Sequence, residues 1–414
     1  MKKTVMILGA ANGQLPFIEI CKNKGYRVIA VSPEGDYPGF KVADQCCYMD
    51  TCDKDRILEV AAREKIDAIL SDQTDVSIPS VAYVSERLGL MSIGYEKALP
   101  FSNKYRMRQK AREIGIPVPN FFEAGTLESA EAGLRELTWP IIMKPVDASG
   151  SRGVVKIHTA DDLRRHFHTS LSYSKTESVI LEEFIEGEEF IADGLALNGK
   201  YINTDLGLKE YFSIPGRFIS KMCMFHSAAA ITQKRELDVL ETNKKLVEGL
   251  ELSFGITHGE YIVSRADNKV YLVEIAARGG GVYLSSHLTP KACGVNVNEV
   301  LIDYVVEGIS VDIEQLRLAQ NAAAFVCFAL EQGTVSEMIN KDELYKTDGV
   351  FKVCLDDLAV GKRVDALTDD SNKYGPILVE AESREGCYNV IERVKNIFDV
   401  IVTKDTGEKS HIIW

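Results

Sequence analysis

Two glutamates in neighbouring strand-like segments have the residue type and spacing of a metal site. Glu260 lies in the segment 258–263 and Glu274 in the segment 271–275, with a turn at 266–268 between them. A hairpin of this kind brings the two side chains close together among apolar neighbours, where an unpaired carboxylate is costly. Carboxylate oxygens are ligands that Mg²⁺ shares with substrate phosphates. The hairpin therefore predicts a magnesium site at Glu260 and Glu274.

Two basic segments could hold phosphate groups near such a metal. Lys144 ends a short strand at 139–145 and precedes the small, flexible loop 147–154, whose backbone amides could close over phosphate oxygens. Arg278 precedes three glycines, and an arginine beside free backbone amides at a helix start can clamp an anion. For each segment a plain turn is the alternative. The chain has no Gly-x-x-x-x-Gly-Lys-Ser/Thr phosphate loop.

The segment 179–190 has the pattern of a strand, a tight turn and a second strand. An adenine ring could pack on its apolar run and bond to the strand edge, and a carboxylate past the turn could accept the ribose hydroxyls. An ordinary hairpin with a solvated acidic turn is the alternative. The pattern is therefore compatible with a nucleotide-binding hinge but does not require one.

The elements that carry these residues change along the chain. Up to about residue 95, short apolar runs alternate with helical stretches, and this order predicts a parallel sheet with helices on both faces. Ligands gather at the carboxyl ends of such strands, which would place Asn12, Asp72 and Asp75 near a crevice. Each of these could equally cap a helix or form a turn. The first loop lacks the glycine spacing of a dinucleotide site.

Beyond a helix near 103–114, the pattern changes to antiparallel strands joined by glycine-containing turns, followed by a smaller α+β piece. We therefore expect a mixture of α/β and α+β architecture in three domains, 1–100, 101–310 and 311–414.

Composition narrows the function classes. The 414 residues include 48 Lys and Arg against 61 Asp and Glu, a formal net charge of −13. This acidity argues against binding to nucleic acid or anionic membranes as the main role, and no apolar run approaches the roughly 18 residues of a membrane span. The nine cysteines, an odd number, fit a reducing environment. We expect a cytoplasmic protein.

Taken in order, these segments resemble the ATP-grasp superfamily, near carbamoyl-phosphate synthetase halves, biotin carboxylase and L-amino-acid ligases. The resemblance implies an N-terminal pre-ATP-grasp domain, a two-lobed ATP-grasp domain and a small C-terminal lid. It implies that Lys104 and Lys144 contact nucleotide phosphate and that Arg278 supports the transferring phosphoryl group. The other residues that it implies are the loop residues Ser149, Gly150, Ser151 and Gly153, the hinge residues Glu182, Glu183, Phe184 and Ile185, the ribose carboxylate Glu189, and the magnesium ligands Glu260 and Glu274.

One position departs from the family pattern. Many members have Glu-x-Asn-Pro-Arg, whereas this chain reads Glu-Ile-Ala-Ala-Arg from Glu274 to Arg278. The asparagine that would coordinate a second magnesium is Ala276, whose methyl group cannot bind metal. The number of metal ions therefore stays open.

The resemblance implies an ATP-dependent ligase that activates a carboxylate as an acyl phosphate for attack by an amine, with ATP and Mg²⁺ or Mn²⁺ as cofactors. Two alternatives remain: carboxylation or carbamoyl-phosphate-type chemistry on bicarbonate, and an ATP-binding sensor without turnover. The partners would be small-molecule carboxylate and amine substrates, with no nucleic acid and no membrane. A homodimer would match the family, in which homodimers are common, but no heptad or apolar stripe in the sequence indicates one. Candidates without an assigned role are the histidines His226 and His258 and the basic residues Lys209, Arg217 and Lys221.

Overall fold

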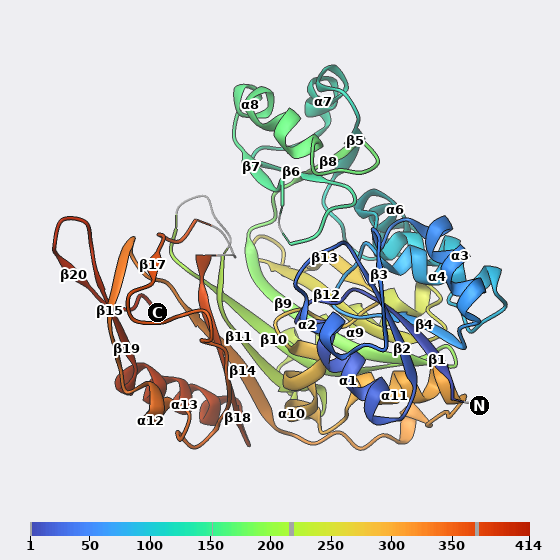
Figure 1. Cartoon of the computed structure of the whole chain (residues 1–414). Helices are drawn as coiled ribbons and strands as arrows, with labels where there is room; N and C mark the ends of the chain where they lie inside the picture. The colour runs from blue at the N-terminus through green and yellow to red at the C-terminus, as the bar shows by residue number, and fades with distance from the viewer. Residues whose placement is uncertain (1, 151, 215–218, 369–371) are drawn as a thin grey trace. The chain divides into compact units, whose positions relative to one another are not determined.

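The computed structural model of the chain describes residues 2–150, 152–214, 219–368 and 372–414 (Figure 1). The chain forms two compact units. The first consists of Met1–Asn203, Leu237–Ser286 and Asn296–Leu316, and the second of Thr204–Glu236, His287–Val295 and Arg317–Trp414. These units do not test the three-domain division, which stays a prediction. Ser151 and Arg217 lie outside the described residues.

The first unit begins with a parallel sheet in the strand order β3-β2-β1-β4. Its elements are β1 (Thr4–Leu8), α1 (Leu15–Asn23), β2 (Arg27–Ser32), α2 (Pro38–Val42), β3 (Gln45–Tyr48), α3 (Lys54–Glu64), β4 (Ala68–Ser71) and α4 (Ile78–Arg87). Strand β1 is buried throughout because both faces of the sheet are covered. Its Met6 and Leu8 pack against α3 and α4. The parallel sheet is as predicted; α2 and β3 were not predicted.

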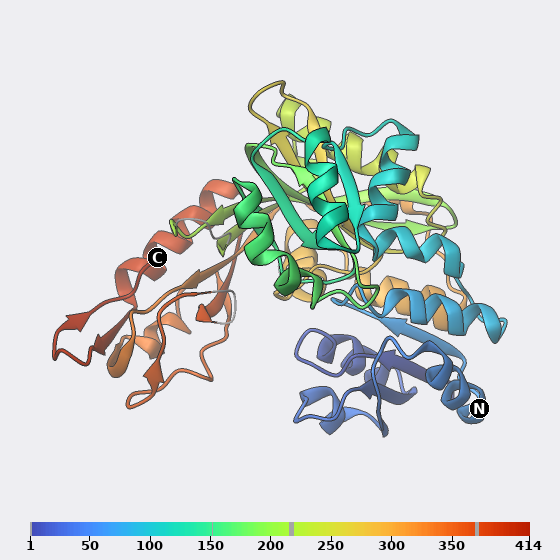
Figure 2. The ribbon, with the colours of Figure 1, turned by 90° about the horizontal axis from the view of Figure 1, so that it is seen from above.

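A connecting segment leads into a four-stranded antiparallel sheet in the order β5-β8-β6-β7. The elements from 95 to 183 are α5 (Tyr95–Ala98), η1 (Leu99–Phe101), α6 (Lys104–Ile114), β5 (Phe121–Ala124), α7 (Leu127–Gly133), η2 (Leu134–Glu136), β6 (Ile141–Pro145), β7 (Val155–Ile157), α8 (Ala160–Leu171) and β8 (Val179–Glu183). Figures 1 and 2 show α7 and α8 on one face of this sheet, where Phe167 and Leu181 share a core. Alternation along the strands leaves the opposite face to Lys144 and Glu182.

The first unit also contains the antiparallel strands β13-β12-β9. Its remaining elements are β9 (Gly187–Leu197), most of α9 (Lys234–Gly249), β12 (Gly255–Ser264), β13 (Val270–Ala276), the first part of η4 (Leu284–Leu288), α11 (Val297–Ile302), η5 (Asp303–Glu307) and η6 (Ile313–Gln315). Asn198 and Gly199, with φ of 53° and 74°, form the predicted tight turn after β9.

The second unit has two antiparallel groups of strands, β10-β11-β14-β18-β16 and β17-β15-β19-β20. Its strands are β10 (Lys200–Tyr211, which begins in the first unit), β11 (Ser220–Ser227), β14 (Ala322–Phe328), β15 (Gly333–Ile339), β16 (Val350–Val353), β17 (Arg363–Val364), β18 (Tyr374–Ala381), β19 (Asp399–Thr403) and β20 (Lys409–Ser410). Its helices are η3 (Ala228–Ala230), α10 (Thr289–Cys293), α12 (Lys341–Leu344) and α13 (Arg384–Ile397).

The expected mixture of α/β and α+β architecture is confirmed. Parallel pairing occurs in the N-terminal sheet, and the other named sheets pair antiparallel. Among the described residues, no helix combines the length and apolar character needed to cross a bilayer. The cytoplasmic location stays a prediction.

Candidate active site

Glu260 and Glu274 lie directly opposite each other on β12 and β13. Like charges in this position repel, so the pair destabilises the sheet unless a cation lies beside it. Their side chains are 26% and 25% exposed, enough for a ligand to reach them. Burial alone would raise the pKa of Glu274, but Lys104 lowers it below its ordinary value against the opposing effect of Glu260. Glu274 is therefore ionised at neutral pH, as a metal ligand must be.

The two glutamates fit one part of a magnesium shell. In the portions of the chain that are described, no group of three or more His, Cys, Asp or Glu side chains is arranged to hold a metal. Mg²⁺ commonly takes one or two protein carboxylates and completes its octahedron with water and substrate phosphates. A pair of opposed glutamates matches this pattern, whereas it would not make a closed structural site for zinc.

Lys104 connects the glutamate pair to the loop 147–154. It begins α6, where Asn103 caps the helix by accepting a hydrogen bond from the Arg106 amide. The Lys104 Nζ lies 3.1 Å from Glu274 Oε1 and donates to the Ala148 carbonyl oxygen over 2.7 Å. The side chain is 7% exposed. Two of the predicted site features, the first lysine and the metal carboxylate, therefore lie together.

Lys144 belongs to a buried charged triad. It forms an ion pair with Glu182, whose other oxygen accepts from Arg108 Nε over 2.5 Å. Arg108 also donates to the Val273 carbonyl oxygen of β13 over 2.7 Å. Burial alone would raise the pKa of Glu182, but Arg108 and Lys144 lower it to about 2. Burial lowers the pKa of Lys144, and Glu182 opposes that effect. The triad fixes Lys144 on the face of the sheet away from α7 and α8.

The hinge segment adjoins this triad. Glu183 points to the other face of β8 from Glu182 and accepts hydrogen bonds from Asn120 Nδ2 and the Thr138 amide. The Phe184 amide donates to the Pro140 carbonyl oxygen, and Lys156 Nζ lies 3.5 Å from the centre of the Phe184 ring. Ile185 follows in the connection to β9.

Glu189 and the loop 147–154 are the remaining parts of the predicted nucleotide site. Glu189, on β9, is partly exposed and pairs with Ile262 of β12. In the loop 147–154, Gly150 and Gly153 have φ of 69° and 73°, and Ser149 accepts from Arg152 Nε through its carbonyl oxygen. The nucleotide-binding roles of the hinge, loop and Glu189 stay predictions.

His258 lies in a row of side chains across three strands. It pairs in register with Asp193 of β9 on one side and Ala276 of β13 on the other. Its Nδ1 lies 2.7 Å from Asp193 Oδ1, and its Nε2 lies 3.4 Å from Glu260 Oε1. Burial alone would lower the pKa of His258, but Asp193 raises it to about 9. Asp193 therefore favours the protonated ring, which stands beside the glutamate pair.

Arg278 is held by a carboxylate from the N-terminal sheet. Asp75, in the segment between β4 and α4, places Oδ1 2.5 Å from Arg278 Nη2, and Arg278 Nη1 donates to the Gly279 carbonyl oxygen over 2.9 Å. Asp72 accepts from the Gly279 amide over 2.9 Å. We expected free backbone amides at a helix start after Arg278; the Gly279 amide is instead bonded to Asp72, and η4 begins only at Leu284.

The glycines after Arg278 are required by close contacts. A Cβ atom on Gly279 would lie 2.3 Å from the Ser285 side chain, and one on Gly280 would lie 2.5 Å from Leu284. Val282 and Tyr283 then have φ of 54° and 62°. A β-branched residue is rare in this region, and such strain is concentrated at functional sites. The turn is thus held tightly between Arg278 and η4.

Three other predicted candidates belong to the second unit. His226, Lys209 and Lys221 belong to the second unit, where burial lowers the pKa of His226 and Lys221 pairs with Glu210 at 3.4 Å.

Three site residues were not predicted in their roles: Arg108, Asp193 and Asp75. For Arg108 a signal existed, because it lies four residues after Lys104 on the same helix face, and the carboxylate in the apolar strand at Glu182 needs a buried cation. The sequence shows that Asp75 follows a strand. Its pairing with Arg278, however, joins residues 203 positions apart, and no local pattern reveals such a contact.

Comparisons with known proteins relate part of the chain to one domain family. Residues 137–286 match the ATP-grasp domain family. An L-arginine-specific L-amino acid ligase of Bacillus subtilis is 24% identical over 361 residues, covering 85% of this chain and 84% of that protein. An alanine–anticapsin ligase of Bacillus subtilis is 27% identical over 285 residues, covering 64% of this chain, which spans only 59% of that protein.

The fold has a solved counterpart. An L-amino acid ligase from Bacillus licheniformis superimposes with a TM-score of 0.79 at 20% identity, covering 97% of this chain and 99% of that one. At this identity the likeness concerns the fold. The chain therefore contains a match to the ATP-grasp domain at residues 137–286 and shares its overall fold with this ligase.

Proposed function

We propose that this protein is an ATP-dependent ligase that activates a carboxylate as an acyl phosphate and transfers the acyl group to an amine. The observation that carries the proposal is the opposed pair Glu260 and Glu274 with Lys104 at its side, which also bonds to the loop 147–154. This arrangement would suit a divalent cation beside bound phosphate groups. The relatives named as amino acid ligases support amino acids as the substrates.

The reaction suits a site that supplies charge more than covalent chemistry. A carboxylate oxygen attacks the γ-phosphorus of ATP, ADP leaves, and the resulting acyl phosphate is attacked by the amine to give the amide, inorganic phosphate and a proton. Phosphoryl transfer depends mainly on positioning and electrostatic stabilisation. Magnesium held by Glu260 and Glu274 would neutralise the triphosphate. Lys104 and Lys144 add fixed positive charges, and Arg278 supports the carboxylate and then the acyl phosphate.

The three cations of the proposed mechanism are buried, and their burial strengthens their effect on the reaction. Lys104, Lys144 and Arg278 have side chains only 7%, 9% and 11% exposed. Electrostatic interactions with a bound anion are stronger in such surroundings than in water. Exclusion of water also protects the acyl phosphate from hydrolysis until the amine arrives.

A coupled assay of ADP release tests the proposal. The protein is mixed with ATP, Mg²⁺ and each member of a panel of carboxylates and amines, with mass spectrometry of the products. ADP release that requires both a carboxylate and an amine, with formation of the amide, is the expected result. Release that depends on bicarbonate instead would establish carboxylation chemistry. ATP binding without any stimulated ADP release would establish a sensor and refute the ligase.

A further inference from the structure

The contact between Arg278 and Asp75 joins the expected acyl-phosphate arginine to a carboxylate that the ATP chemistry does not use. Asp75 is 4% exposed, and the Arg278 side chain is 11% exposed. Their charged atoms, Nη2 and Oδ1, are 2.5 Å apart. Asp75 lies at the carboxyl end of β4, the edge at which ligands of parallel sheets bind.

The hydrogen-bonding capacity of this ion pair is incompletely used. Among the described residues, the buried Arg278 Nε has no hydrogen-bond partner, and Asp75 Oδ1 has none apart from its ion-pair contact with Arg278 Nη2. Buried polar atoms without such partners are rare in native proteins and call for an explanation. A ligand that offers both an acceptor for Arg278 and a donor for Asp75 would satisfy both.

The carboxylate of the neighbouring Asp72, in contrast, has hydrogen-bond partners for both of its oxygens. Its two carboxylate oxygens accept hydrogen bonds from the Gly279 amide, Ser285 Oγ and Asn298 Nδ2 at 2.9, 2.9 and 3.3 Å. Asp72 is 1% exposed. It is therefore committed to holding the turn after Arg278, whereas the Asp75 side chain forms its ion pair with the arginine side chain itself.

The charges around Arg278 favour a particular kind of substrate. Asp75, Glu274 and Asp72 all act electrostatically on the Arg278 guanidinium. Lys104 and His258 act on Asp75 in the opposite sense to Glu274. A substrate with a carboxylate and no cation would still add a negative charge beside these carboxylates. An α-amino acid brings its ammonium group with its carboxylate, so the net charge of the site does not change.

We propose that Asp75 is the residue that recognises the α-ammonium group of the activated amino acid, by exchanging its ion pair with Arg278 for one with the substrate. In the exchange the substrate carboxylate takes the arginine, and the ammonium group donates hydrogen bonds to the released Asp75 carboxylate. Asp75 is thereby a specificity-determining residue: it selects amino acids over plain carboxylates. This proposal rests on the ligase function proposed above.

The variant Asp75→Asn tests this assignment with matched substrate pairs. Each pair consists of an amino acid and the acid in which hydrogen replaces the α-ammonium group: L-alanine with propionate, L-methionine with 4-(methylthio)butanoate, and L-phenylalanine with 3-phenylpropanoate. The wild-type protein should prefer the amino acid of a pair in kcat/KM for ADP release. Asp75→Asn should lower kcat/KM for the amino acid by about ten- to a hundred-fold, since a hydrogen bond to a charged group is lost. For the des-amino acid it should leave the value unchanged or raise it, because Asp75 no longer competes for Arg278.

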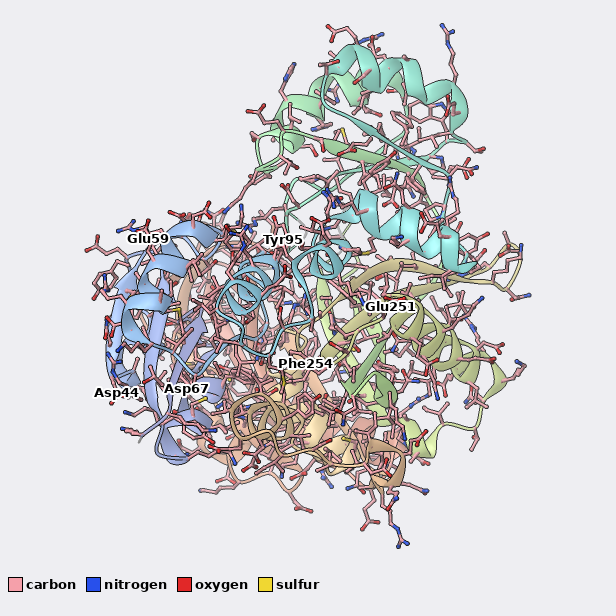
Figure 3. All side chains as sticks on the ribbon, turned by 90° about the vertical axis from the view of Figure 1, so that its right-hand side faces the viewer. Asp44, Glu59, Asp67, Tyr95, Glu251 and Phe254 are labelled. Carbon is pink, nitrogen blue, oxygen red and sulfur yellow. The ribbon has the colours of Figure 1, made fainter. Side chains whose placement is uncertain are left out.

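A purely structural role of Asp75 would give a different pattern, because damage to the fold lowers kcat/KM for both members of a substrate pair alike. The proposal would be overturned if Asp75→Asn lowered kcat/KM equally for both members of a pair or for neither of them. It would also be overturned if the wild-type protein did not prefer the amino acid. Asp44→Asn is the matched control. Asp44, just before the edge strand β3, forms a partly exposed ion pair with Lys22 of α1, and Figure 3 labels it beside the N-terminal sheet. Asp44→Asn should not change kcat/KM for either member of a pair.

Binding measurements separate this proposal from the ligase function. Calorimetric titration of the wild-type protein with the same pairs, in the presence of Mg²⁺ and AMP-PNP, reports recognition without turnover. Binding of an amino acid that is lost in Asp75→Asn would support the role of Asp75 even if no amide forms. ADP release with carboxylates but no selective binding of amino acids would refute the role of Asp75 and leave the ligase standing.

Discussion

Replacement of Glu182 by glutamine should destabilise the sheet β5-β8-β6-β7 through its buried charges. The pKa of Glu182 falls from an ordinary 4.5 to about 2, which corresponds to about 3 kcal/mol of stability at about 1.4 kcal/mol per pKa unit. The variant also leaves Arg108 and Lys144 without their shared carboxylate, and breaking a buried pair in this way costs about 3–5 kcal/mol. We therefore expect a loss of at least about 3 kcal/mol at pH 7.

The two tryptophans allow a local measurement. Trp139 lies just before β6, the strand that carries Lys144, and Trp414 is the other tryptophan of the chain. In a Trp414→Phe background, urea unfolding followed by Trp139 fluorescence reports on this sheet. Glu183→Gln is the matched control, since this neighbouring carboxylate bonds to Asn120 and Thr138 on the other face. We expect it to cost about 1 kcal/mol.

The pH dependence has a definite sign. Because the folded pKa of Glu182 lies below its unfolded value, its contribution is complete above about pH 5.5 and is lost as the pH falls from 4.5 toward 2. The difference between the wild-type protein and Glu182→Gln should therefore decrease as the pH falls below 4.5. Equal losses in Glu182→Gln and Glu183→Gln, or a difference that does not change with pH, would refute the charged triad.

Three further substitutions test the rest of the site. Glu274→Gln should abolish Mg²⁺-dependent ADP formation without changing the circular dichroism spectrum, and unchanged activity would remove Glu274 from the metal site. Lys144→Met should weaken ATP binding by about tenfold or more, since a charged contact is lost, and an unaltered ATP affinity in calorimetry would exclude a phosphate role. Gly279→Ala should cost about 1–3 kcal/mol and most of the activity because its Cβ would lie 2.5 Å from Asp72 Oδ1. Gly281→Ala, with no described atom within 4 Å, should be neutral by both measures.

Much of the fold follows from patterns that are local in sequence. The apolar runs at 5–8, 28–31 and 68–70 are the strands β1, β2 and β4, since buried parallel strands are apolar throughout. The helix near 103–114 ends at Gly115 in the left-handed conformation, as a glycine C-cap should. The strand β3 was missed because its residues, Gln-Cys-Cys-Tyr, form a partly exposed edge without an apolar run.

The site was predictable only where its residues share a hairpin or a loop. The pairing of Glu260 with Glu274 follows from a short turn between two strands. The triad of Arg108, Lys144 and Glu182 joins a helix to two strands, and burial rather than spacing selects its members. Long-range contacts of this kind follow from packing of whole elements, so sequence patterns show the residues but not their partners.

The strand register gives a reason for Ala276, which stands where the family pattern has asparagine. Ala276 is fully buried and lies directly opposite His258, whose ring stands 3.4 Å from Glu260. Directly opposed side chains share one face, so an asparagine at this position would meet the imidazole beside the glutamate pair. The small alanine and the buried histidine are therefore parts of one packing arrangement. A shift of one residue in register would move His258 to the other face, which is why the sequence alone could not connect the two. Ala276 thus reflects a different set of neighbours for the glutamates and does not argue for loss of turnover.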